Sequence, residues 1–159
     1  MIGEHLYGFR EMIRLRAATA NELEIFDQMD RQPHARRFVL QTGIDQHRKN
    51  FRDPLITYLV VEDDSETLCG YFILVFEPEN DSVEFRRILI DQSKRGIGQT
   101  AISLMESYCR KTWSASRIWL DVFEDNEVGC HIYPKLGYTF FGETDFEGRA
   151  LKLYEKQLS

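Results

Sequence analysis

The sequence predicts a single α/β domain of the α+β type, in which a mixed, mostly antiparallel central sheet is flanked by helices. Two observations predict it. Three strand-like segments follow one another with connections too short for parallel crossovers, and the hydrophobic period then changes to that of a helix. The length of 159 residues suits one compact core and is too short for two ordinary ones. No repeat, low-complexity tract or linker interrupts this order, so we expect one domain over residues 1–159.

The first third of the chain is expected to hold one strand and two helices. Apolar and basic residues alternate in MIRLRAAT, residues 12–19, as in a half-buried strand. A helical run follows with Leu23, Phe26 and Met29 on one face, and it is predicted to be capped by Thr19 or Asn21. Residues 30–37 are polar and contain a proline, which predicts an irregular segment. A second short helix is expected over 44–51.

β-branched and aromatic residues dominate the middle of the chain and predict strands over 55–63, 67–77 and 83–90. The clusters DDSE and PENDS between them are typical of turns, so these strands form an antiparallel meander. Over 97–108 apolar residues recur at helical spacing, and a strand over 116–124 follows. The third strand, this helix and the fourth strand therefore predict a βαβ crossover.

A helix and two strands are expected to close the chain. The helix covers DNEVGCHIYPKL, is capped by Asp125 or Asn126, and is stopped by Gly137. Pro134 inside it removes a backbone donor, which predicts a kink or an early end. The segments YTFFGET and RALKLYEKQ are then predicted as strands joined through DFEG.

Composition and charge favour a globular protein. Hydrophobic residues make up 43% of the chain and charged residues 29%, and no apolar run reaches the about 18 residues of a transmembrane helix. The first residues, MIGEHLYGFREMIRLR, lack the order of a secretory signal, so we expect a cytoplasmic protein without a membrane partner. The net charge of −6 argues against nucleic-acid binding and mildly favours cationic partners such as amines.

The cysteines and histidines show no metal-binding pattern. Cys69, Cys109 and Cys130 are isolated and odd in number, and the four histidines lack metal-ligand spacing. We therefore expect free thiols in a reducing compartment, without a disulfide framework and without a metal site.

The clearest binding motif is KRGIGQT, residues 94–100, directly after a predicted strand and before a predicted helix. Two glycines at this point predict a backbone cradle for a phosphate group at a helix N-terminus. A nucleoside triphosphate is excluded because the lysine of a P-loop follows the glycines, and here it precedes them. A dinucleotide fits GIGQTA and Asp121 on the next strand, but its fold needs further βαβ units. A dinucleotide-binding domain therefore stays an alternative, beside coenzyme A.

Two separated motifs and the order of elements resemble the GNAT family of acyl-CoA N-acyltransferases, over nearly the whole chain. Ser93 to Gly98 resembles the family pattern Q/R-x-x-G-x-G/A, with Ser93 in place of the usual Gln or Arg. About thirty residues later, a second segment resembles N-x-x-A-x-x-x-Y-x-x-x-G-F through Asn126, Gly129, Tyr133, Gly137 and Tyr138. Gly129 replaces the usual alanine, which leaves more room for a close ligand but weakens a helix by about 1 kcal/mol.

The resemblance implies a fold with a splayed central strand pair that binds an acyl-CoA, with acetyl-CoA as co-substrate and no metal. Backbone groups of the predicted strand over 83–90 would pair with the pantetheine arm, and the glycine turn would hold the pyrophosphate. The cofactor-binding residues implied are Ile88, Leu89, Ile90, Lys94, Arg95, Gly96, Ile97, Gly98, Gln99, Thr100, Asn126, Gly129 and Tyr133.

The resemblance also implies the chemistry, a direct attack of an amine on the thioester in a ternary complex. Tyr133 corresponds to the tyrosine that protonates the departing thiolate. Glu84, on the central strand, corresponds to the general base of the histone acetyltransferase branch. Asp121 and Glu124, near the end of the next predicted strand, are the alternative bases.

The acceptor implied by the resemblance is a primary amine, either a protein N-terminus, a polyamine or another small amine. A homodimer is possible, because many relatives pair through sheet edges. A noncatalytic acyl-CoA sensor, which keeps the cradle and lacks turnover, is the other alternative function.

Overall fold

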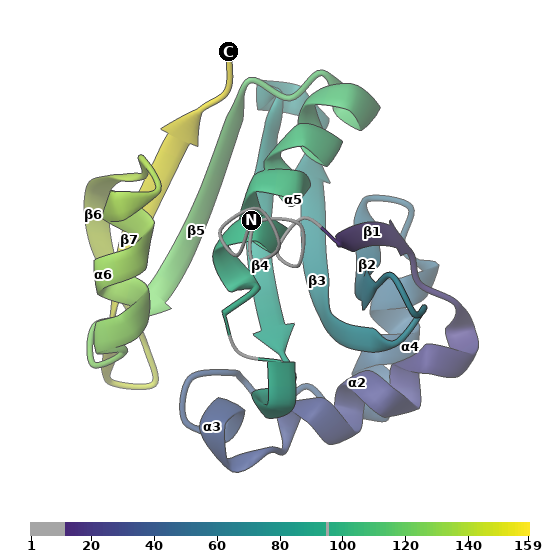
Figure 1. Ribbon diagram of the computed structural model, residues 1–159. Helices are drawn as coiled ribbons and strands as arrows, with labels where there is room; N and C mark the ends of the chain where they lie inside the picture. The colour runs from purple at the N-terminus through teal and green to yellow at the C-terminus, as the bar shows by residue number, and fades with distance from the viewer. Residues whose placement is uncertain (1–11, 95) are drawn as a thin grey trace, which may run out of the picture.

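The computed structural model describes residues 12–94 and 96–159, and all of its strands lie in one seven-stranded sheet (Figure 1). The strands are β1 (Ile13–Ala17), β2 (Ile56–Asp63), β3 (Leu68–Glu77), β4 (Ser82–Ile90), β5 (Arg117–Phe123), β6 (Thr139–Phe146) and β7 (Arg149–Gln157). The helices are α2 (Leu23–Asp30), α3 (Pro33–Arg36), α4 (Ile44–Arg52), α5 (Gly98–Trp113) and α6 (Glu127–Lys135), with 3₁₀ turns at Ala20–Glu22, Pro78–Asn80 and Gln92–Lys94.

The sheet has the order β1-β2-β3-β4-β5-β7-β6. Strands β2 to β4 form the predicted antiparallel meander, and β1 pairs with β2, also antiparallel. Helix α5 carries the chain across to β5, which pairs with β4 in parallel. The last strand, β7, lies between β5 and β6 and is antiparallel to both. The predicted mixed, mostly antiparallel sheet flanked by helices is therefore confirmed.

The pairing of β4 with β5 is short and determines the shape of the molecule's centre. Only three residue pairs join them, from Ser82 opposite Arg117 to Glu84 opposite Trp119. Beyond this point β4 continues to Ile90 beside β3 alone, so the two strands diverge. A β-bulge, in which Arg86 is the extra residue of β4 opposite Ile73 and Leu74, lies where they separate. The splayed strand pair that the resemblance implied is present.

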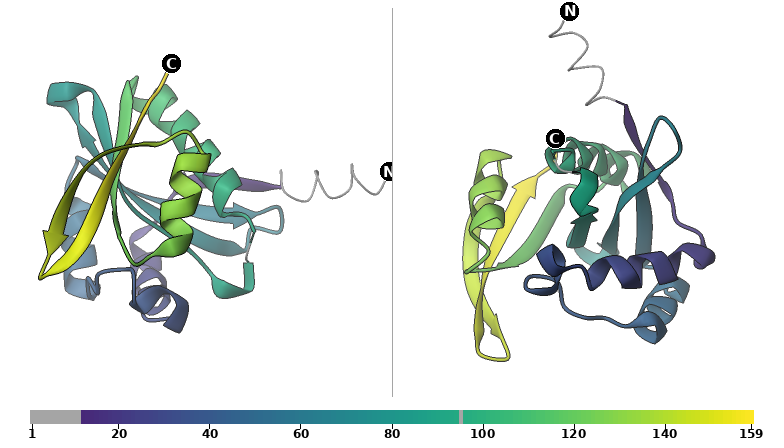
Figure 2. Two further views of the ribbon diagram at one scale, coloured as in Figure 1. Left: turned by 90° about the vertical axis from the view of Figure 1, so that its left-hand side faces the viewer. Right: turned by 60° about the horizontal axis from the view of Figure 1, so that its bottom comes forward.

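Helices lie on both faces of the sheet (Figure 2), and an apolar layer is buried on each face. On one, called here the α5 face, Ala101, Ile102, Met105 and Cys109 of α5 pack on β1 to β5, and residues of α6 lie against the same layer. On the other, the α2 face, Leu23, Phe26 and Met29 pack on β2, β3 and β4. These α2 residues are the helical stripe that the sequence predicted.

Most local signals in the sequence are confirmed, with one correction. Residues 30–37 were expected to be irregular, yet Pro33 begins the one-turn helix α3. Proline is favoured at the first helical position, where its missing N–H has no helical partner to lose. Asn126 caps α6 as predicted, and α6 ends at Lys135, directly after Pro134. Gly137 follows with φ +94°, the left-handed conformation of a helix stop.

Within residues 12–94 and 96–159, no helix is long and apolar enough to cross a membrane.

Candidate active site

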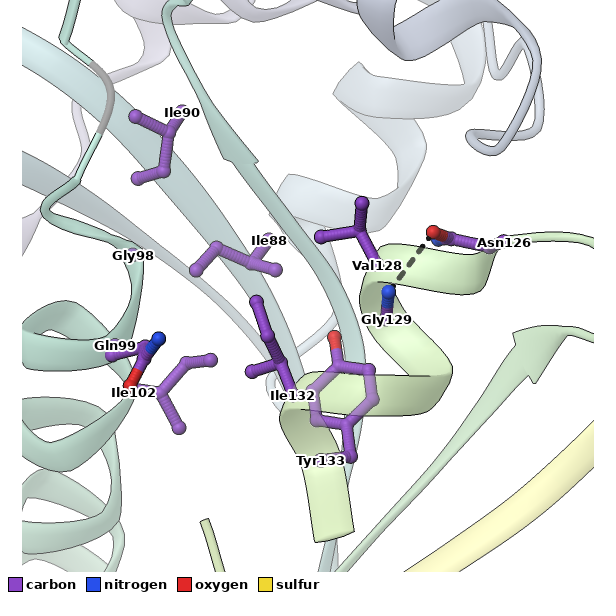
Figure 3. A pocket seen from close by; sticks show the side chains of 10 residues that line it. All are labelled: Ile88, Ile90, Gly98, Gln99, Ile102, Asn126, Val128, Gly129, Ile132 and Tyr133. Carbon is purple, nitrogen blue, oxygen red and sulfur yellow. Dashed lines mark hydrogen bonds between the residues drawn. The ribbon is translucent and has the colours of Figure 1, made fainter. Parts of the chain in front are cut away.

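A cleft of about 1110 Å³ opens where β4 and β5 diverge. Its lining comes from both faces of the sheet. On the α5 face lie Gly98, Gln99 and residues of α6, and on the α2 face lie Glu84, Asp121 and the segment 38–42. A pocket of about 210 Å³ at the α5 face, shown in Figure 3, lies between the start of α5 and the start of α6. The splay therefore produces a passage through the sheet.

The glycine turn presents bare backbone at the α5 end of this passage. Gly96 has φ +95°, and a Cβ placed on it would meet no atom within 4 Å. A Cβ on Gly98 would meet only Cγ1 of Ile90, at 4.0 Å, so packing within the protein does not require a glycine there. The N-terminus of α5 has no side-chain cap and no acidic residue in its first turn. Its free N–H groups and its dipole therefore suit an anion.

The side chains beside the turn point in several directions. Gln99 lines the pocket, whereas Ile97 packs into the apolar layer of the α5 face. Thr100 is half-buried on α5 and does not line the cleft. Lys94 places its Nζ 3.6 Å from Oδ2 of Asp63, so part of its charge is neutralised at the end of β2. The predicted ligand Arg95 lies outside the described residues.

The β4 residues Ile88, Leu89 and Ile90 divide between the two faces. Ile88 and Ile90 line the pocket, as Figure 3 shows. Leu89 is 5% exposed and packs against the α2 layer. On one edge these residues pair with β3, and on the other the pairing with β5 has already ended. That edge offers free backbone groups to a ligand, except that Nε2 of His34 lies 2.9 Å from the Ile90 carbonyl oxygen.

Asn126 and Gly129 secure the start of α6. The Gly129 N–H donates to Oδ1 of Asn126 at 3.0 Å, the dashed contact in Figure 3. A Cβ on Gly129 would lie 2.9 Å from Cγ2 of Val122 and 3.1 Å from Nδ2 of Asn126. The sequence suggested that this glycine leaves room for a ligand. The structure corrects this, because α6 approaches β5 so closely that neighbouring protein atoms take up the room.

Tyr133 is half-buried between two aromatic rings. Its ring centroid lies 6.0 Å from that of Phe85 and 5.8 Å from that of Tyr138. In Figure 3 its hydroxyl points toward the space bounded by Ile88 and Gly129. Burial raises the pKa of Tyr133 to about 12, and nearby Cys130 adds to the shift. The hydroxyl thus stays protonated at neutral pH. Tyr133 lines the cleft, so the neighbouring Pro134 does not direct its side chain away from it.

Two carboxylates lie on the α2 face of the splay. Glu84 accepts two hydrogen bonds from Arg86, from Nε at 3.0 Å and from Nη2 at 2.9 Å. Asp121 has no ion-pair or hydrogen-bond partner among the described side chains. Partial desolvation by the surrounding protein raises the pKa of Asp121. The negative charge of Glu84 raises it further, and the positive charge of Arg86 opposes the shift. The third candidate, Glu124, is exposed and lies outside the cleft lining.

A buried polar cluster supports the α2 side of the cleft, and the sequence did not reveal it. Asp30 is fully buried and accepts hydrogen bonds from the Tyr71 hydroxyl and from Nη1 of Arg87, the latter at 3.1 Å. Arg87 lines the cleft, and its Nη2 donates to the Leu40 carbonyl at 2.8 Å. Gln41 donates to the Asp30 carbonyl at 2.9 Å. The segment 38–42 is therefore tied to β4 and α2 at the edge of the cleft.

Asp27, Asp30 and His47 bring potential metal ligands within 4.8 Å of one another. Hydrogen bonds and an ion pair among protein side chains already engage the ligand atoms of these three residues. Nε2 of His47 lies 2.8 Å from Oδ2 of Asp30, and Nδ1 lies 2.7 Å from the Tyr58 hydroxyl. A neutral ring satisfies both contacts, since Nε2 donates to the carboxylate and Nδ1 accepts from the phenol. Asp27 pairs with Arg31. The group is therefore satisfied as a hydrogen-bonded network.

Residues 18–138 match the acetyltransferase (GNAT) family. A spermine/spermidine N(1)-acetyltransferase from Bacillus subtilis is 28% identical over 79 residues, which are 48% of this chain and 52% of that protein. A probable spermine N(1)-acetyltransferase from Bacillus subtilis subsp. natto matches with the same identity and coverage. The chain thus spans about half the length of the curated relatives it matches.

Solved structures show the same fold. The spermidine N-acetyltransferase of Vibrio cholerae in complex with CoA and spermine has a TM-score of 0.80 and 20% identity, and the match covers 92% of this chain and 96% of that one. A dodecameric structure of that enzyme in an intermediate state has a TM-score of 0.76 and 21% identity, covering 92% and 94%.

Proposed function

The chain belongs to the acetyltransferase (GNAT) family, and from this premise we propose that it transfers the acetyl group of acetyl-CoA to a primary amine by direct attack in a ternary complex. One observation carries the proposal. A single cleft joins the glycine turn on the α5 face to Glu84 and Asp121 on the α2 face. A thioester that enters from the first side meets an amine held at the second, so proximity supplies much of the rate.

The proposed position of coenzyme A follows from the bare backbone of the cradle. Amides at the start of α5 contact the pyrophosphate, since neither Gly96 nor Gly98 places a Cβ in its path. Lys94 adds positive charge at the turn, and Arg95, outside the described residues, stays a predicted ligand. The pantetheine arm pairs with the free edge of β4 over residues 88–90. The remaining contacts are assigned to the predicted residues Gln99, Asn126, Gly129 and Tyr133, which line the cleft or its pocket. The predicted residues Ile97 and Thr100 do not line it, so only their backbone groups are assigned to the ligand.

Tyr133 is proposed to stabilise the leaving thiolate. When the amine nitrogen bonds to the thioester carbon, the C–S bond breaks and negative charge collects on sulfur. A phenol with a pKa of about 12 is a far weaker acid than a thiol of about 8.5, so full proton transfer is uphill by about 5 kcal/mol unless the site also raises the thiol pKa. The main contribution of Tyr133 is therefore a hydrogen bond donated to the developing thiolate.

A carboxylate is proposed to take the proton of the acceptor ammonium, because an amine with a pKa near 10.4 is almost entirely protonated at pH 7. Both Glu84, the predicted base, and Asp121 line the cleft. Glu84 is held by Arg86, whereas Asp121 has a raised pKa and an open carboxylate, which favour proton acceptance. Asp121→Asn should therefore lower the rate at pH 7 more than Glu84→Gln, with both losses smaller at pH 9. The reverse order at pH 7 would return the role to Glu84.

The names of the relatives make polyamines the first acceptors to assay, beside protein N-termini and other small amines. The dodecamer of the Vibrio cholerae enzyme makes self-association worth measuring, and a homodimer and a cytoplasmic location stay predictions for this chain.

Thiol release from acetyl-CoA, measured against a panel of primary amines, tests the function. We expect release with at least one amine and a rise in melting temperature with acetyl-CoA but not with NAD. Gly98→Asp should abolish acetyl-CoA binding, because it adds a negative charge where the pyrophosphate lies. Gly148→Asp adds the same charge in the β6–β7 turn and should leave binding intact. Binding without release against any amine would make the protein a noncatalytic acyl-CoA sensor. A melting shift with NAD alone would make it a dinucleotide-binding domain.

A further inference from the structure

Resting on the proposed function, we infer that the acceptor is a primary amine with a single positive charge and an apolar body, and that the chamber on the α2 face of the cleft disfavours a second cationic group. The ammonium lies at Asp121, and the body of the acceptor lies between two apolar walls.

The charges on the chamber floor leave room for one cation. Glu84 and Asp121 supply two negative charges, and Arg86, bound to Glu84, returns one positive charge. The Arg87 charge is matched by buried Asp30. The floor is therefore net negative by one, and the open carboxylate belongs to Asp121.

The walls above this floor are apolar. Phe123 and Leu151 are opposite one another in β5 and β7, so they share the face of the sheet on which Asp121 lies. Phe146 is 40% exposed and lines the cleft beside them. Across the cleft, segment 38–40 contributes Phe38, Val39 and Leu40 to the lining. Such walls favour the hydrocarbon part of a ligand. The polar lining that follows them, Gln41, Thr42, Gln46 and Asn50, is uncharged, so it gives a second ammonium no counter-charge.

Positive charge lies just outside the cleft lining, where the Arg149 guanidinium covers the ring of Phe123. Nη2 of Arg149, on β7, donates to the Arg37 carbonyl at 3.1 Å and to Oδ1 of Asp125 at 3.3 Å. The Arg37 guanidinium approaches the same carboxylate, Nη2 lying 3.7 Å from Oδ2. Two guanidinium groups and one carboxylate leave one net positive charge there. It repels the distal end of a polycation.

The next carboxylate in the lining is too far away to hold a second ammonium of a short acceptor. Asp91 follows β4 at its far end. Asp121 lies two residues beyond Trp119, the partner of Glu84, so Asp91 is about five residues farther along the sheet, on the order of 15 Å, and the two strands diverge in between. It also accepts a hydrogen bond from Oγ of Ser93 at 3.1 Å. A diamine of moderate length would thus place its second charge against the apolar walls.

Heptylamine, 1,7-diaminoheptane and spermidine separate the alternatives, since the first two share a chain length and differ in one charge. We expect kcat/KM for heptylamine to exceed that for either of the others by at least tenfold in the thiol-release assay. Calorimetry with the CoA-loaded protein should show the same order of affinities without any need for turnover. Equal or better values for the diamine or for spermidine would overturn the inference, whichever assay gave them.

Two variants test whether the Asp121 carboxylate binds the ammonium group of the acceptor. Asp121→Asn should weaken heptylamine binding to the CoA-loaded protein by tenfold or more and leave CoA binding unchanged. Glu143→Gln removes the same charge from the exposed strand β6, outside the cleft, and should change neither. Unaltered heptylamine affinity in Asp121→Asn, or absence of heptylamine binding in the wild type, would refute the inference. Absence of thiol release with ordered binding intact would refute only the proposed function.

Discussion

The two sides of the cleft are built differently, although each is secured by one buried carboxylate. On the side of α2 and β2 to β4, called here the body, Asp30 is 0% exposed and accepts from Tyr71, His47 and Arg87. On the side of α6, β6 and β7, called here the arm, the carboxylate is Glu106 of α5, which is 6% exposed. It accepts from the Tyr138 hydroxyl at 2.8 Å and from Nζ of Lys156 at 3.0 Å.

The difference lies in what surrounds these carboxylates. Behind Asp30 the rings of Phe26 and Tyr71 stack at 4.2 Å within a fully buried apolar layer. In the arm, α6 has no fully buried residue, and Phe140 and Phe146 of β6 are 48% and 40% exposed. The body wall of the cleft is thus held by a dense core. The arm buries fewer side chains, among them Tyr138 and Tyr154, and exposes most of α6 and β6, so we expect the arm to open at lower free energy.

The largest effect is expected at the body carboxylate. Asp30→Asn leaves the buried Arg87 guanidinium without its counter-charge, so the free energy of unfolding should fall by about 3–5 kcal/mol. Asp27→Asn on the same helix is the matched control. Arg31, the partner of Asp27, is 62% exposed. The free energy of unfolding of Asp27→Asn should therefore fall by less than about 1 kcal/mol. Urea unfolding measures both, and equal losses would mean that the Asp30 cluster adds nothing specific.

Tyr133 belongs to the arm, yet its proposed role lies at the strand pair in the centre. Tyr133→Phe keeps the ring contacts with Phe85 and Tyr138 and removes only the hydroxyl. The turnover number should fall by about ten- to a thousandfold, with little change in the Michaelis constant for acetyl-CoA. Since the pKa of this phenol is raised to about 12, it should contribute no limb to the pH–rate profile below pH 10. A variant with wild-type turnover would leave Tyr133 a packing residue.

At the arm carboxylate a smaller effect is expected. Glu106→Gln weakens the contact with Lys156 and keeps an acceptor for Tyr138, so the free energy of unfolding should fall by about 1–2 kcal/mol. Amide hydrogen exchange sharpens the comparison. It should accelerate in β6 and β7 for Glu106→Gln, and in β2 and β3 for Asp30→Asn. Uniform acceleration in both variants would show that body and arm unfold as one unit.

The smallest effect is expected at Asp121, which lies between the two regions. Its pKa is raised above the ordinary value of 3.8, so the folded state binds its proton more tightly than the unfolded chain does. This residue therefore reduces stability as pH rises from 3.8 through the folded pKa. Asp121 is exposed, so solvent screens much of this effect. Asp121→Asn should therefore raise the melting temperature at pH 7 only slightly, and the gain should vanish below pH 4. A gain that persists at pH 3 would have another origin.

Local signals in the sequence predicted most of the fold, because they depend on residues a few positions apart. The glycine turn preceded α5, Asn126 capped α6 through the N–H of Gly129, and Gly137 stopped it. Alternation and turn clusters predicted the meander and its order. The exception was Pro33, which begins a helix where an irregular segment was expected.

The candidate site required the tertiary structure, because its decisive contacts join distant parts of the chain. Arg87 lies 57 positions from Asp30, Tyr138 lies 32 from Glu106, and Arg149 lies 112 from Arg37. Residue type alone could not show that Arg86 binds the Glu84 carboxylate and leaves the Asp121 carboxylate without a partner. Nor could it show that close packing against Val122 is the reason for a glycine at position 129. The sequence by itself determined which elements form and where the glycine turn before α5 lies, since propensity and capping act locally. Only the tertiary structure decided which charges remain open in the cleft, since ion pairing and burial depend on which distant side chains meet.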